Sequence, residues 1–131
     1  MAATFALGAS LDVPDNAKIA RVETVMSTSE FQTDPNPTSQ YTARNVRYAP
    51  SQYGGGKAQG VLVSTYKSSV TDVYAQAICF DAVGKVNGGG FTFVDLVPAG
   101  RSTGVSISVD TSGKTAKCDI YAAPSNLSKT K

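Results

Sequence analysis

The chain has 131 residues, 41% of them hydrophobic and 17% charged, which indicates one globular domain with no apolar run of about 18 residues to cross a membrane. It contains no histidine and two cysteines, so Ser-His-Asp catalysis, Cys-His catalysis and four-ligand structural zinc sites are excluded. Its 12 basic and 10 acidic residues give a net charge of +2, a smaller surplus than a nucleic-acid-binding surface normally carries. We therefore expect no nucleic-acid partner, no metal ion and no cofactor.

The composition favours β-structure. The chain has 14 Val and 4 Ile against 5 Leu and 2 Glu, and β-branched side chains keep their preferred rotamers on a pleated sheet. An all-helical bundle is therefore nearly excluded.

The first forty residues predict one clear strand, over residues 4–11, with larger side chains on one face and small ones on the other. A turn follows at 12–16. Residues 18–26 fit either a short helix or a strand, and we predict a strand; the polar, proline-containing segment 27–40 is predicted to be a loop. The larger side chains of the first strand are Phe5, Leu7, Ala9 and Leu11.

The rest of the chain predicts short strands separated by turn signals. In one of them Val105, Ile107 and Val109 alternate with serines, so we expect these three side chains in the core and the serines in water. Both faces of 73–81 are apolar, which predicts a central strand. The predicted strands are 41–48, 60–66, 73–81, 91–97, 105–109 and 117–122, with turns at Ser68-Ser69, Val83-Gly84, Pro98-Ala99-Gly100 and Ser112-Gly113.

About seven short strands at regular spacing predict an all-β fold, an antiparallel immunoglobulin-like β-sandwich. A closed barrel is the alternative. The predicted organisation is an N-terminal extension strand and turn over 1–14, a β-sandwich domain over 15–124 and a C-terminal tail over 125–131.

The two cysteines lie in separate predicted strands and not in a CxxC motif. We expect Cys79 and Cys118 to form a disulfide; two buried free thiols are the alternative. A bridge closing a loop of about 40 residues would stabilise the fold by roughly 4 kcal/mol and would persist in an oxidising compartment, so the expected location is extracellular or in the cell envelope. The segment TFALGASL is too short for the apolar core of a signal peptide, so we expect a mature or recombinant form of a longer precursor; the alternative is the whole gene product, with the cysteines free.

The stretch Ile78-Cys79-Phe80-Asp81-Ala82-Val83-Gly84-Lys85-Val86 resembles the FxLYD family of small β-sandwich domains in bacterial and archaeal secreted or surface proteins. The resemblance rests on the aromatic-Asp pair Phe80-Asp81 followed by a turn centred on Gly84. Residues 88–100 are similar to the next strand of the family and its Pro-Gly turn.

This resemblance covers about residues 41–122 and implies a non-catalytic extracellular module without catalytic residues. The chain departs from the family in two places. Its aromatic pair is reduced to Cys79-Phe80, and residues 1–40 have no counterpart in the family core.

Other candidate sites favour structural roles. Asp12 and Asp15 lack the spacing of a calcium loop and fit turn and cap positions. Gly88-Gly89-Gly90 lacks the Lys-Ser/Thr and the helix of a phosphate loop, so it predicts a glycine bulge or a hairpin turn. Tyr53 is expected in a loop and most other tyrosines in the sheet, a tyrosine recognition surface being the alternative. Asn126-Leu127-Ser128 matches a glycosylation sequon.

We expect a non-catalytic module that acts in protein-protein binding or structural assembly, with a protein partner or copies of itself. One alternative is a self-assembling subunit of a filament, pilus or shell, in which the strand at 4–11 pairs with another subunit; the same strand could instead open its own sheet. A hydrolase is the other alternative, and it requires Asp95 and Asp119 to lie within about 10 Å across a cleft.

Overall fold

The computed structural model describes part of the N-terminal region and the whole of the chain from Gln40 onward. None of the described residues is helical, and six strands are present, which confirms the all-β prediction. The strand predicted over 4–11, with Phe5, Leu7, Ala9 and Leu11, lies outside the described residues. These are residues 14, 16–18, 20, 21, 23, 25 and 40–131.

The strands follow one another with short connections, and every paired neighbour is antiparallel. The turns lie where the sequence predicts them, although most strands extend by a few residues beyond the predicted ranges. The strands are β1 (Tyr41–Pro50), β2 (Gly56–Ser64), β3 (Val70–Phe80), β4 (Val86–Val97), β5 (Ser102–Thr111) and β6 (Lys117–Pro124).

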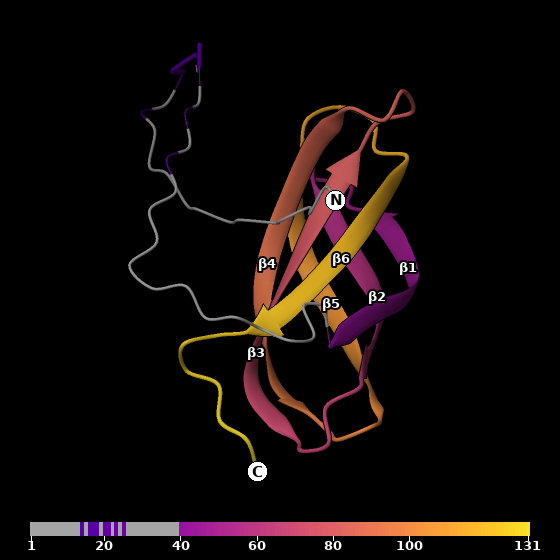
Figure 1. Ribbon diagram of the computed structural model, residues 1–131. Helices are drawn as coiled ribbons and strands as arrows, with labels where there is room; N and C mark the ends of the chain where they lie inside the picture. Colours follow the sequence, from indigo (N-terminus) through magenta and orange to yellow (C-terminus); the bar gives the residue numbers. More distant parts are fainter. Residues whose placement is uncertain (1–13, 15, 19, 22, 24, 26–39) are drawn as a thin grey trace. The chain divides into compact units, whose positions relative to one another are not determined.

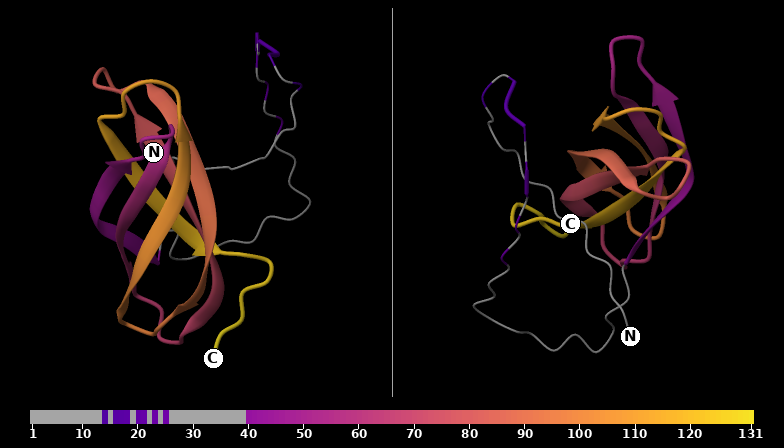
Figure 2. Two further views of the ribbon diagram at one scale, coloured as in Figure 1. Left: turned by 180° about the vertical axis from the view of Figure 1, so that it is seen from behind. Right: turned by 90° about the horizontal axis from the view of Figure 1, so that it is seen from above.

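The six strands form one sheet in the order β1-β2-β5-β4-β3-β6, which curls until it is nearly closed. The two end strands, β1 and β6, contact each other without a ladder between them in the described residues (Figure 1). Figure 2 shows the curled sheet from two further directions. In the middle, the β4-β5 ladder consists of Gly88 opposite Thr111 and Gly89 opposite Asp110. This short ladder divides the sheet into a β1-β2-β5 half and a β4-β3-β6 half.

Side-chain alternation decides which residues enter the core. Val105, Ile107 and Val109 of β5 are buried while Ser106 and Ser108 are exposed, as predicted. The prediction that 73–81 is central is also confirmed, because β3 pairs with β4 on one side and β6 on the other.

The core lies between the two halves of the sheet and forms two clusters of buried side chains. Each cluster draws residues from both halves, so neither half buries its inner face alone. The larger cluster is Ala58, Leu62, Ala75, Ala77, Cys79, Val105, Ile107, Val109, Cys118 and Ile120, and the smaller is Tyr41, Val70, Val73 and Val97.

The glycine run at 88–90 lies inside β4, so the prediction of a hairpin turn there is wrong. The strand needs glycine because a Cβ at Gly88 or Gly90 would collide with the backbone of β5. An irregularity of register does occur immediately before the run: Phe80 pairs with Val86 while Cys79 pairs with Gly88, which leaves Asn87 as an extra residue.

The strand predicted over 18–26 is not found at the described residues of this range, Lys18, Ala20, Arg21, Glu23 and Val25. A strand requires a neighbour to satisfy its backbone groups, and no described strand pairs with these residues. The other residues of this range lie outside the described part of the chain.

The C-terminal residues run back along the start of β3. Thr130 forms an isolated bridge with Val70, and the hydroxyl groups of Ser125 and Ser128 both donate to the carbonyl oxygen of Asp72, at 2.7 and 2.9 Å. Asp72 has a φ of 51°, and the two hydroxyls hold its carbonyl in this strained conformation. The division of the chain into 1–14, 15–124 and 125–131 stays a prediction.

Candidate interaction surface

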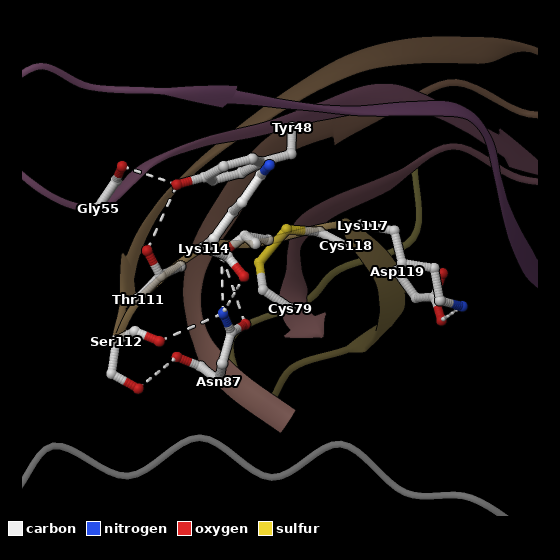
Figure 3. Close-up of a disulfide and its surroundings, with 11 residues drawn as sticks. Tyr48, Gly55, Cys79, Asn87, Thr111, Ser112, Lys114, Lys117, Cys118 and Asp119 are labelled. Carbon is white, nitrogen blue, oxygen red and sulfur yellow. Dashed lines mark hydrogen bonds and ion pairs between the residues drawn. A yellow bond between two sulfur atoms is a disulfide. The ribbon is translucent and has the colours of Figure 1, made fainter. Parts of the chain in front are cut away.

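Cys79 and Cys118 form a disulfide, which confirms the predicted pairing (Figure 3). The two residues lie directly opposite each other in the β3-β6 ladder, and both are buried in the larger core cluster. The bridge closes a sequence separation of 39 residues, so it holds β6, the last strand, against the central strand of its half.

The predicted motif residues lie where β3 meets β4: Phe80 ends β3, and Asp81 and Gly84 lie in the connection. The Asp81 carboxylate accepts hydrogen bonds from the backbone N–H groups of Val83 and Lys85, both at 2.9 Å. Gly84 adopts a φ of 82°, which favours glycine. These interactions assign a turn-forming role to Asp81 and Gly84.

Asn87, the extra residue of β4, joins this end of the sheet to the β5-β6 connection (Figure 3). Its amide nitrogen donates to the carbonyl oxygens of Ser112 and Lys114 and to the Thr115 hydroxyl, at 3.4, 3.3 and 3.1 Å. In return, the Ser112 backbone N–H donates to the Asn87 carbonyl at 2.8 Å. The bulge thus aims one polar side chain at three acceptors.

The outer face of the β4-β3-β6 half carries aromatic side chains. Val73, Ala75 and every second residue after them in β3 are buried and face the core. The residues between them therefore face outward. Residues directly opposite in an antiparallel ladder share a face, which places five side chains together. We name this set the aromatic platform: Tyr74 and Gln76 of β3, Phe91 and Phe93 of β4, and Tyr121 of β6.

The Tyr74 ring contacts both phenylalanine rings of the platform, and the two phenylalanines and Tyr121 are exposed to solvent. The Tyr74 ring lies 5.5 Å from that of Phe91 and 5.2 Å from that of Phe93, between centroids, with tilted planes. Phe91 and Phe93 are 47% and 46% exposed, and Tyr121 is 36% exposed. At the centre, the amide of Gln76 is buried and donates to the Tyr74 hydroxyl at 3.1 Å. The surface is therefore apolar at its margin, with a fixed polar group in its middle.

The outer face of the β1-β2-β5 half differs. Lys57 and Gln59 of β2 point outward, because Ala58 between them is buried. Their four partners across the ladders are all exposed, and three of them are polar, the exception being Ala49. We name this set the polar face: Arg47, Lys57, Gln59, Ser106 and Ser108. Such a surface is typical of the solvated side of an antiparallel sheet.

The predicted carboxylate pair does not form. Asp119 pairs with Ile78 in the β3-β6 ladder, whereas Asp95 lies near the opposite end of β4, between residues opposite Thr71 and Val73. At about 3.3 Å per residue this offset along β3 alone is close to 20 Å. Asp119 instead forms an ion pair with Lys117 at 3.2 Å, and Lys117 also lies 5.0 Å above the Phe80 ring. No three His, Cys, Asp or Glu residues cluster as metal ligands in the described ranges.

Two further tyrosines occupy contrasting positions. Tyr53 is 89% exposed in the β1-β2 connection, as predicted. Tyr41 is buried, and this burial, together with the nearby Tyr66, raises its pKa from 10.0 to about 12. Their rings lie 5.3 Å apart.

Sequence reasoning placed Phe91 and Phe93 in a predicted strand and considered a recognition surface of tyrosines alone, so it did not join the phenylalanines with Tyr74 and Tyr121. The available signal was two aromatic residues at a spacing of two, which must share one face of a strand. Which strand lay beside them, and hence the contribution of Tyr74, depended on a register that the sequence did not specify.

No helix in the described part of the chain is long and apolar enough to span a membrane. The resemblance to the FxLYD family stays a prediction from Phe80, Asp81 and Gly84. The chain matches no protein-family model, and neither a curated protein nor a solved structure shows significant similarity to it.

Proposed function

We propose that the chain is a non-catalytic extracellular or cell-surface module that acts through its outer surface, in protein binding or in structural assembly. The aromatic platform is the observation that carries this proposal. Aromatic residues dominate the energetics of protein interfaces, and clustered exposed apolar side chains are typical of surfaces that another molecule covers. The polar face, on the same domain, has no such cluster among its named residues.

We also propose that the fold is an immunoglobulin-like β-sandwich. The short β4-β5 ladder and the position of the core between the two halves support it, because a sandwich packs two sheets across one apolar layer. The FxLYD resemblance agrees with this architecture.

The disulfide supports the proposed location. Disulfides persist in oxidising compartments and are rare where glutathione and thioredoxin keep thiols reduced. Cys79 and Cys118 are both buried and bonded to each other. This arrangement fits a stabilising bridge rather than a redox site.

Photo-cross-linking in the cells that make the protein tests the proposal. A benzophenone amino acid replaces Phe93 on the platform in one variant and Ser106 on the polar face in the matched control. We expect discrete cross-linked species from position 93 and none from position 106, and mass spectrometry then distinguishes another protein from a second copy. Equal labelling from both positions, or none from position 93, would refute a role for the platform.

A second candidate is a self-assembling subunit whose N-terminal strand pairs with a sheet edge of another copy. It is favoured by β1 and β6, which lie side by side without a ladder in the described residues, because an added strand pairs with the edge of a sheet. It ranks second because both edges carry features that oppose pairing: an irregular register and two arginines in β1, and Lys117 and Pro124 in β6.

Light scattering of the native chain tests this second candidate. A self-assembling subunit gives a large particle that dissociates when residues 1–11 are deleted. A mass near 13.6 kDa at all concentrations would reject it.

A further inference from the structure

We propose that the outer face of the β1-β2-β5 half binds a polysaccharide that carries anionic groups. Three cationic residues of this face make the contact, and we name them the basic row: Arg44, Arg47 and Lys57. The inference adds a second binding surface to the domain. It goes beyond the proposed function of the aromatic platform, which lies on the other half of the sheet.

The first argument is the distribution of charge between the two halves. Strands β1, β2 and β5 contain three basic residues, those of the basic row, and one acidic residue, Asp110, a net charge of +2. Strands β3, β4 and β6 contain one basic and three acidic residues, a net charge of −2. The strands that carry the polar face therefore attract anions, and those that carry the platform do not.

The second argument is the arrangement of the basic row. Arg44 lies opposite Val61 of β2 and Arg47 lies opposite Gln59, and residues directly opposite in an antiparallel ladder share a face. Lys57 is the next outward residue of β2 beyond Gln59. Three consecutive outward positions therefore have one cation each, over a length of about 13 Å. A line of cations fits a linear polymer with repeated anionic groups.

The third argument is that no described carboxylate neutralises the basic row. All three side chains are exposed, and both ion pairs among the described residues involve other residues. Asp110 lies one outward position beyond Ser108, the partner of Lys57, and forms no ion pair with a described residue. The two guanidinium groups are thus available for paired hydrogen bonds to the carboxylate or phosphate groups of a ligand.

The neutral neighbours of the basic row favour a polysaccharide. Ser106 lies opposite Gln59 and Ser108 lies opposite Lys57, so hydroxyl and amide groups flank the cations. These groups both donate and accept hydrogen bonds, as sugar hydroxyls do. The face therefore combines charge for the anionic groups of a polysaccharide with hydrogen-bonding partners for its sugar rings.

Other anionic partners fit this face less well. Membrane surfaces and single-stranded nucleic acids are bound with exposed aromatic side chains, whereas the aromatic residues of these strands, Tyr41 and Tyr48, pack against the core. An extended acidic peptide gains affinity by main-chain pairing at the edge of a sheet. The basic row lies on a face and includes β2, which is paired on both sides.

Carboxymethyl dextran and unsubstituted dextran test the inference, because the two polymers share a sugar chain and differ in charge. Titration calorimetry measures their affinity for the full chain in about 50 mM salt, where charges are weakly screened. We expect the parent protein to bind carboxymethyl dextran and not dextran. Raising the salt to roughly 300 mM should weaken the binding, because fewer counterions are then released with a gain in free energy.

Two charge-matched variants assign the binding to the face. R44Q/R47Q/K57Q removes the basic row and should weaken the binding of carboxymethyl dextran by at least about tenfold. K85Q/K114Q/K129Q removes the same charge from exposed positions outside this face and should change the affinity by less than about twofold. Circular dichroism confirms the fold of both variants, and K57Q alone serves if the first one unfolds.

Each contrary result overturns the inference. Equal losses in the two triple variants mean that net charge acts without a site, and equal binding of dextran means that the anionic groups play no part. Tighter binding of polyglutamate or of phosphatidylglycerol vesicles than of carboxymethyl dextran assigns the face to an acidic peptide or to a membrane. Polysaccharides vary in mass, so this contact gives no discrete cross-linked species at position 106, and cross-linking at position 93 decides the proposed function separately.

Discussion

The two halves of the sheet share one construction and differ in what they show to solvent. Each consists of three antiparallel strands with buried apolar residues on the inner face. On the outer face, the β1-β2-β5 half presents the polar face next to half-buried Val61 and Val63, and the β4-β3-β6 half presents the aromatic platform. Inward residues stabilise the fold in both halves, so the outward residues are where the two surfaces can differ in function.

The halves also differ in how they are held. The disulfide joins β3 to β6, two of the three strands that carry the platform, so the surface that we propose to bind a partner stands on a covalently linked pair of strands. Among the described residues, the β1-β2-β5 half has hydrogen bonds and core packing alone. A rigid platform loses little conformational entropy on binding.

Among the changes that test the difference between the two halves, removal of the disulfide is expected to lower the free energy of unfolding most. In C79A/C118A we expect the free energy of unfolding to fall by about 4 kcal/mol, because a loop of this length is no longer closed in the unfolded chain. Urea denaturation measures the loss, and amide exchange shows whether the β1-β2-β5 half loosens as well, as expected if the two halves unfold together. Alkylation of both thiols without a reductant would contradict the bridge itself.

Truncation of a core side chain in the β1-β2-β5 half should have the second largest effect on the free energy of unfolding. Leu62 of β2 is fully buried, and Leu62→Ala is expected to lower the free energy of unfolding by about 3 kcal/mol, through lost burial and the cavity that remains. Leu127→Ala is the matched control, since Leu127 is 59% exposed and its truncation should change stability by less than about 0.5 kcal/mol. Equal losses in the two urea experiments would show that Leu62 is not a core residue.

Loss of the Asn87 hydrogen bonds at the bulge should lower the free energy of unfolding by less. Asn87→Ala removes hydrogen bonds to Ser112, Lys114 and Thr115, and we expect a loss of about 1 to 2 kcal/mol with faster amide exchange in the β5-β6 connection. Asn126→Ala, at an exposed position in the C-terminal turn, is the control and should leave urea unfolding unchanged. If exchange rises equally in all strands, Asn87 supports the whole sheet rather than this connection.

The sequence predicted features that depend on neighbouring residues and missed features that depend on contacts between segments far apart in the chain. Alternation in β5 and the apolar character of β3 are local patterns, and they correctly predicted the buried Val105, Ile107 and Val109 and the central strand. The glycine run was misplaced because its cause, the close backbone of β5, lies twenty residues away along the chain. The platform likewise depends on the pairing of β3 with β4, which no local pattern determines.

The contact between the two halves around Tyr41 is tested by the pH dependence of the free energy of unfolding. This test has the smallest expected effect. Tyr41 belongs to β1 but packs against Val70, Val73 and Val97 of the other half, and its burial, with Tyr66 nearby, raises its pKa to about 12. Between pH 10 and 12 the unfolded chain has lost the Tyr41 proton while the folded chain retains it, so stability present below pH 10 falls as the pH rises, by at most about 1.4 kcal/mol per unit. Urea unfolding at several pH values in this window should therefore give a flatter dependence for Tyr41→Phe than for the parent, whereas Tyr53→Phe, at an exposed site, should follow the parent. An identical slope in all three proteins would mean that Tyr41 is open to water and that the two halves do not meet around its ring.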